Sequence, residues 1–136
     1  MFHVTSHIAA PPERVWAILT EPAILAGGGF GITELTGQMR PGGRLALKAE
    51  IDPNRTFKLR VAEFTPSHRM VWTSGMPLGL FRGTRTFALT PDGPNTTFSM
   101  EEVFTGPMKG LIVPHIPDLQ PSFETFANAL KERSEK

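Results

Sequence analysis

Apolar and polar side chains alternate along most of the first 106 residues, and this period of two predicts a succession of β-strands. Clusters of Gly, Pro, Asn and Asp interrupt the alternation, so the strands are short and are separated by turns. Consecutive strands joined by such short turns must run antiparallel. The strands are expected at residues 2–8, 32–39, 44–51, 56–64, 70–75, 82–90 and 96–106, with one of the turns at residues 52–55.

Helical spacing replaces the alternation in two places. Pro11 and Pro12 favour the start of a helix that ends near Glu21, because proline fits the first helical turn, and residues 22–26 are expected to begin a second short helix. Beyond Pro107 the apolar residues recur on one helical face. An antiparallel sheet with one apolar face buries that face against such a helix, which indicates an α+β fold. The helical face comprises Leu119, Phe123, Phe126, Ala127 and Leu130.

Two charged residues interrupt the apolar faces of the last two predicted strands. Arg85 shares a strand face with Phe87, and Glu102 shares one with Phe98 and Met100. Charges are costly in an apolar interior unless they are paired, so this pattern indicates a lined cavity. The turn between the strands places Arg85 opposite either Met100 or Glu102. The two charges are therefore a structural ion pair, side chains at a wet cavity mouth, or a polar anchor for a ligand.

The apolar residues around these charges are candidates for the cavity wall, with plain core packing as the alternative. Two loops are candidate gates: residues 27–31 with Phe30, and residues 76–81 with Phe81. The first loop lacks the Lys-Ser/Thr that follows a phosphate-binding loop. The second is expected to pack against its own domain, and a patch that touches a partner or a membrane surface is its alternative. The predicted ligand-binding residues are Arg85, Glu102, Trp72, Phe87, Phe98, Met100, Phe123 and Phe126.

Composition excludes several other classes of function. The net charge of +1 gives no electrostatic reason to expect a nucleic acid or an anionic membrane as partner. Cysteine is absent, which removes disulfides, thiolate metal sites and cysteine nucleophiles. No stretch reaches the roughly 18 apolar residues of a membrane span, and no signal peptide is recognisable at the start. A single domain over residues 1–136, cytoplasmic and without integral membrane association, is expected.

The histidines do not predict a metal site. His3 and His7 share a strand face but lie about 13 Å apart, which is too far for one ion. His68 is expected in a turn, and His115 is a candidate for the edge of the cavity mouth. No metal and no organic cofactor is therefore expected.

Several segments in this order resemble the START-like (SRPBCC, helix-grip) superfamily, and in particular its polyketide cyclase/dehydrase branch. These segments are residues 8–16 (IAAPPERVW), 70–72 (MVW), 80–89 (LFRGTRTFAL) and 102–107 (EVFTGP). The resemblance implies a curved seven-stranded antiparallel sheet that grips a long C-terminal helix, two short helices after the first strand, and an apolar cavity. The chain departs from many relatives by having Arg85 in place of a histidine and Met100 in place of a polar residue.

The resemblance implies binding of a small hydrophobic ligand, such as a lipid, an aromatic polyketide, a quinone or a steroid-like molecule. One alternative is a metal-free, cofactor-independent cyclase or dehydratase, in which Arg85 stabilises a developing oxyanion. Another alternative is a carrier or a chaperone-like interaction protein. Binding without turnover is favoured, because an inward-facing His or Asp for proton transfer is missing, and no catalytic residue is assigned. A monomer and a homodimer both remain open.

Overall fold

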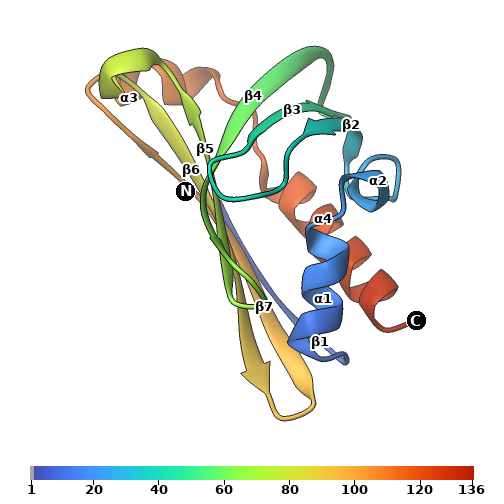
Figure 1. Ribbon diagram of the computed structural model, residues 1–136. Helices are drawn as coiled ribbons and strands as arrows, with labels where there is room; N and C mark the ends of the chain where they lie inside the picture. Colours follow the sequence, from blue (N-terminus) through green and yellow to red (C-terminus); the bar gives the residue numbers. More distant parts are fainter. Residues whose placement is uncertain (1) are drawn as a thin grey trace.

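A computed structural model describes residues 2–136 of the protein. Seven strands form one antiparallel sheet with the order β1-β7-β6-β5-β4-β3-β2. The sheet is strongly curved, and it is not closed into a barrel (Figure 1). The strands are β1 (Phe2–Ile8), β2 (Ile32–Gly37), β3 (Arg44–Ala49), β4 (Asp52–Thr65), β5 (Arg69–Gly75), β6 (Arg82–Asp92) and β7 (Asn95–Thr105).

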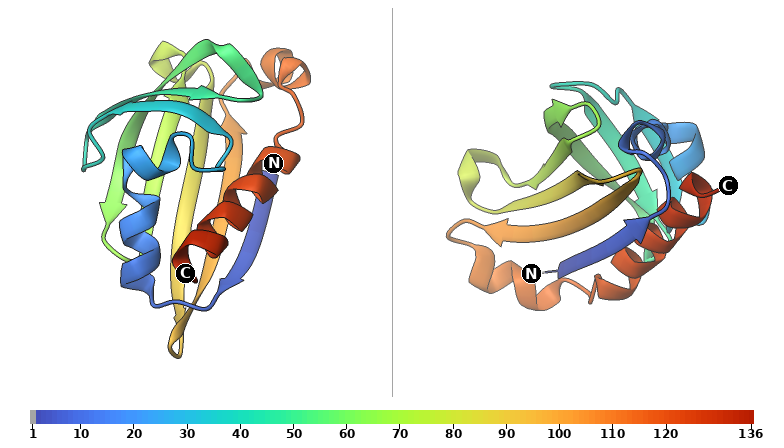
Figure 2. Two further views of the ribbon diagram at one scale, coloured as in Figure 1. Left: turned by 90° about the vertical axis from the view of Figure 1, so that its right-hand side faces the viewer. Right: turned by 90° about the horizontal axis from the view of Figure 1, so that it is seen from below.

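The helices lie mainly on the concave side of this sheet. Figure 2 shows the long helix α4 crossing that side, with α1 and α2 on the same side. This arrangement confirms the predicted α+β helix-grip fold. The helical segments are α1 (Pro12–Leu19), α2 (Pro22–Leu25), η1 (Pro77–Gly79), α3 (Lys109–Ile112), η2 (Val113–His115) and α4 (Gln120–Ser134).

The two main helices form for the reasons that the sequence indicates. Pro12 occupies the first turn of α1, where its missing N–H is not required, and Pro121 does the same in α4. Each helix presents one apolar face to the sheet, and burial of that face stabilises the helix more than its intrinsic propensity does. The buried faces are Val15, Trp16, Ile18 and Leu19 in α1, and Phe123, Phe126, Ala127, Ala129 and Leu130 in α4.

Side chains of α4 fasten the helix to the backbone of β1. The Gln120 amide group donates to the carbonyl oxygen of His3 at 2.7 Å and accepts from its N–H at 3.3 Å. Lys131 Nζ donates to the carbonyl of His7 at 2.7 Å. Because β1 is an edge strand, these contacts satisfy backbone groups that would otherwise lack a partner.

Glu135 completes this attachment just beyond the end of α4. Its carboxylate accepts the Ala9 N–H at 2.8 Å and pairs with Lys131 Nζ at 2.6 Å. The backbone hydrogen bond from Ala9 is the main cause that lowers the pKa of Glu135, and the hydrogen bond from Lys131 adds to it. A lowered carboxyl pKa means that the attachment stabilises the fold above the ordinary glutamate pKa and weakens as the pH falls through the folded-state value.

The expected turn at residues 52–55 is wrong, because β4 already begins at Asp52. Ala49 pairs with Asp52, so the chain reverses through residues 50 and 51, and the side chain of Ile51 is 41% exposed. A register shift follows Leu47, and the ladder to β3 resumes at Phe57. Residues 53–56 therefore form a bulge in which Pro53 needs no ladder hydrogen bond.

Candidate functional site

Arg85 and Glu102 face each other across β6 and β7. They are direct partners in the strand register, and Arg85 Nη2 lies 3.3 Å from Glu102 Oε1. The guanidinium group also lies over the ring of Phe123, with 4.9 Å between its central carbon and the ring centroid. Glu102 is buried, at 8% exposed, and Arg85 is half-buried. The two charges thus form an ion pair beneath the helix α4.

This ion pair lies in the wall of a cavity of about 720 Å³. The cavity is bounded by residues 30–32, by β3 to β7, by the segment after β7 and by the first half of α4. Eight of the ten residues predicted to bind a ligand or to gate the cavity line it: Trp72, Arg85, Met100, Glu102, Phe123, Phe126, Phe30 and Phe81.

Phe87 and Phe98 are placed differently, in the packed core behind the wall. Both rings are fully buried, and their centroids lie 5.7 and 6.4 Å from that of Phe126. Phe87 also contacts Trp72 edge to face at 4.7 Å. The structure therefore assigns these two residues to the support of Phe126 and Trp72, both of which line the cavity.

The bulged part of β4 adds polar groups to the cavity wall, where the sequence predicted a turn at residues 52–55. Asp52, Arg55 and Lys58 line the cavity, together with Phe57. The bulge breaks the strict alternation of sides, so neighbouring residues of β4 border the same space. His115 also lines the cavity, where it was expected to edge the mouth.

The two loops named as gates have different surroundings. Phe30 is buried, and its ring meets Phe126 edge to face at 5.0 Å, while Phe81 stacks on Phe104 at 5.7 Å. The expectation that the loop at residues 76–81 packs against its own domain is wrong for Leu78, which is 95% exposed. A gating role for either phenylalanine stays a prediction.

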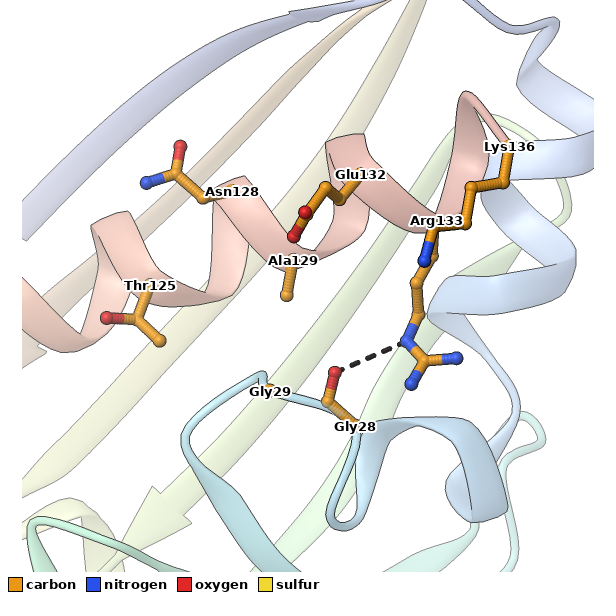
Figure 3. A pocket seen from close by; sticks show the side chains of 8 residues that line it. All are labelled: Gly28, Gly29, Thr125, Asn128, Ala129, Glu132, Arg133 and Lys136. Atoms are coloured by element: carbon orange, nitrogen blue, oxygen red, sulfur yellow. Dashed lines mark hydrogen bonds between the residues drawn. The ribbon is translucent and has the colours of Figure 1, made fainter.

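A second, smaller hollow of about 320 Å³ lies outside the cavity, between the glycine loop (residues 27–31) and the last turns of α4. Figure 3 shows Arg133 reaching across it, and its Nε donates to the carbonyl of Gly28 at 3.2 Å. A Cβ atom at Gly28 would lie 2.1 Å from the carbonyl oxygen of Ile24, so only glycine fits there. This hollow therefore marks where α4 holds the loop that carries Phe30.

Two other classes of feature, a metal site and a membrane-spanning helix, are absent from the described part of the chain. Within residues 2–136, no group of three or more His, Cys, Asp and Glu side chains has a geometry that could hold a metal ion. No helix in the same range is long and apolar enough to cross a membrane.

The open antiparallel sheet curves around the C-terminal helix, and a cavity with aromatic side chains lies between them. This arrangement defines the helix-grip class of proteins. The family model described as "Polyketide cyclase / dehydrase and lipid transport" matches residues 1–135. The chain belongs to this family. No curated protein matches the sequence.

Solved structures with the same fold support this assignment at the level of the fold. TTHA0849 from Thermus thermophilus is 24% identical, with a TM-score of 0.69 over 98% of this chain and 95% of that one. CalU16 from Micromonospora echinospora is 18% identical, with a TM-score of 0.68 over 98% and 74%. Truncated norcoclaurine synthase from Thalictrum flavum is 16% identical, with a TM-score of 0.65 over 97% and 91%.

Proposed function

We propose that the protein binds a small hydrophobic molecule in the cavity between the sheet and α4. The observation that supports this proposal best is the cavity itself, whose volume of about 720 Å³ falls in the range of small-molecule sites. Its wall combines aromatic rings with one internal ion pair, and such sites are mainly apolar with a few polar groups that orient the ligand. Polyketides and lipids are the ligand classes that the family description names. An aromatic polyketide, a quinone and a steroid-like molecule are ligands of the mainly apolar kind that such a wall accommodates.

Partly blocking the cavity should weaken the binding of a neutral aromatic probe. Ala49 lies on β3 in the cavity wall, and in an Ala49→Trp variant the indole ring would occupy part of the space. We expect the affinity for pyrene to fall by about tenfold or more, because the probe and the indole ring compete for one volume. The measurement is a fluorescence titration with pyrene, whose emission spectrum reports the polarity around it.

The matched control places the same side chain outside the cavity. Ala17 is exposed on α1, so Ala17→Trp should leave the affinity for pyrene unchanged. Equal loss in both variants, or no binding of pyrene by the unmodified protein, would refute the cavity proposal.

Turnover of the bound molecule is the alternative that the family description supports. Arg85 can stabilise a developing oxyanion, but its guanidinium group offers only hydrogen-bond donors and cannot accept a proton. Glu102 is the carboxylate that pairs with Arg85, at 3.3 Å, and is the candidate for a catalytic base. A Glu102→Gln variant that turned over a substrate at the full rate would exclude Glu102 as the catalytic base.

A carrier function is the second candidate, because apolar side chains are exposed close to the cavity. Leu78 projects from the loop between β5 and β6, and Leu111 in α3 is 70% exposed. The two segments are adjacent, since the Met108 N–H donates to the Leu80 carbonyl at 2.9 Å. We call the exposed side chains of Leu78 and Leu111 the exposed rim of the cavity. A carrier would use this rim to contact the membrane that supplies its ligand.

The exposed rim should affect ligand transfer more than ligand binding. We expect Leu78→Ser to slow the protein-dependent transfer of a pyrene-labelled phospholipid between phosphatidylcholine vesicles about threefold or more, because the contact loses apolar area. The affinity for free pyrene should not change. An equal transfer rate in Leu78→Ser and in the control Ala17→Ser would argue against the carrier function.

A further inference from the structure

Two buried N–H groups in the cavity wall have no hydrogen-bond acceptor within the described residues. They are Nε1 of Trp72 and Nε of Arg85. Nearly all buried polar groups in folded proteins have a partner, and a donor without one is costly. Two such donors in one wall therefore call for a functional explanation.

The strand register brings the two donors to the same part of the wall. Trp72 on β5 and Arg85 on β6 are direct partners across the antiparallel ladder, and both line the cavity. Directly opposite residues have Cβ atoms about 5 Å apart and lie on the same face of the sheet. A single ligand group that enters this face would therefore lie next to both side chains, whose donor atoms are buried at the wall.

The neighbouring side chains hold the two donor groups in place but offer them no hydrogen-bond acceptor. Trp72 packs edge to face on Phe87, and the guanidinium group of Arg85 lies over Phe123. Arg85 uses Nη2, and not Nε, in its contact with Glu102. The neighbouring phenylalanine rings offer no acceptor oxygen, so the protein provides a rigid, apolar frame around two unused donors.

The charge at this position also restricts the ligand. The positive charge of Arg85 is balanced by the carboxylate of Glu102 at 3.3 Å, so the spot carries no net charge. A ligand carboxylate would meet the carboxylate of Glu102 as well as the two donors, and like charges repel at such distances. A neutral carbonyl oxygen accepts two hydrogen bonds without this penalty.

We infer that Trp72 and Arg85 form a subsite for a neutral carbonyl oxygen, and that the cavity selects apolar ring compounds that carry a ketone or quinone group. This inference rests on the proposed function, because it specifies the ligand of the same cavity. The carbonyl oxygen accepts hydrogen bonds from Trp72 Nε1 and Arg85 Nε, while the hydrocarbon part contacts the aromatic wall.

Fluorenone and fluorene test the subsite, because they have the same ring frame and differ in the carbonyl oxygen. We expect fluorenone to bind about tenfold more tightly than fluorene, after correction for the partition of each compound between water and octanol. The affinities are measured by isothermal titration calorimetry. In Trp72→Phe this preference should fall severalfold, because the ring remains and the donor is lost.

A matched control separates the donors from the general shape of the wall. Phe104 lines the same cavity and carries no hydrogen-bonding side chain. Phe104→Leu should weaken both probes and leave the preference for fluorenone unchanged. A preference that falls as much in Phe104→Leu as in Trp72→Phe would overturn the assignment of the donor.

A second readout uses the unmodified protein and does not depend on the folding of a variant. The chain has two tryptophans, and Trp16 lies on α1 against Phe64 and not among the residues that line the cavity. In a nitrogen–proton NMR spectrum, fluorenone should move the indole N–H signal of Trp72 downfield, as a new hydrogen bond does, and leave that of Trp16 in place. Fluorene should cause no downfield shift of this kind.

The outcomes distinguish the inference from the proposed function. If both probes bind with equal corrected affinity and the Trp72 signal shows no downfield shift with fluorenone, the carbonyl subsite is wrong and the hydrophobic cavity stands. If neither probe binds, the proposed function itself is wrong.

Discussion

Replacement of Phe126 by alanine is expected to lower the free energy of unfolding by about 3–5 kcal/mol. Phe126 is buried at the centre of α4 and contacts three other aromatic rings, those of Phe30, Phe87 and Phe98. Its truncation removes the aromatic contacts of α4 with the sheet and with Phe30 of the glycine loop, and the space enlarges an existing cavity instead of closing. Urea-induced unfolding followed by circular dichroism measures the change.

The control for this prediction is a truncation at the surface. Leu78 is 95% exposed, and Leu78→Ala should change the free energy of unfolding by less than about 0.5 kcal/mol. A loss below about 1 kcal/mol in Phe126→Ala would contradict the packing described here. It would mean that α4 is held mainly by its polar contacts with β1.

Replacement of Glu102 by leucine is expected to lower the free energy of unfolding by about 2–4 kcal/mol, because Arg85 then remains half-buried without its partner. The estimate lies somewhat below that for a fully buried pair, since 24% of the Arg85 side chain is exposed. The double variant Arg85→Met/Glu102→Leu should recover most of this loss, because the wall is then apolar throughout. Chemical unfolding of the single and double variants gives both values.

The comparison of the Glu102→Leu variant with the double variant shows whether the ion pair serves folding or ligand binding. At 3.3 Å between single atoms, the pair lacks the two parallel hydrogen bonds of a strong Arg–carboxylate contact. If the double variant is as stable as the original protein but loses the preference for fluorenone, the charges serve the ligand. A double variant that is no more stable than Glu102→Leu would show that the pair is required for folding.

The sequence was sufficient for the fold and for the position of the two charges. Strict alternation in residues 82–90 and 96–106 placed Arg85 and Glu102 on the inner face, where the structure has them. Their register stayed open because residues 91–95 allow turns of different length. The structure shows a two-residue turn at Gly93 and Pro94 between Asp92 and Asn95, with φ of 61° at Gly93, which pairs Arg85 with Glu102.

Other features of the site depend on tertiary structure, which the spacing of apolar residues along the sequence does not determine. The bulge at residues 53–56 contains Pro53 and Asn54, which are typical turn residues, so the sequence predicted a turn where the strand continues. Phe87 and Phe126 are both apolar and inward-facing, but only the packing of α4 decides that one supports the wall and the other lines it. The lack of hydrogen-bond acceptors for Trp72 Nε1 and Arg85 Nε depends on which residues surround them, and the sequence alone does not reveal these neighbours.

We expect the space between the sheet and α4 to hold a hydrophobic molecule. The most direct test is a titration of the protein with fluorene, followed by the two indole N–H signals in a nitrogen–proton NMR spectrum. Because Trp72 lines the cavity and Trp16 lies elsewhere, the Trp72 signal should move in a saturable way while the Trp16 signal stays in place. No saturable change at Trp72, or equal changes at both tryptophans, would contradict it.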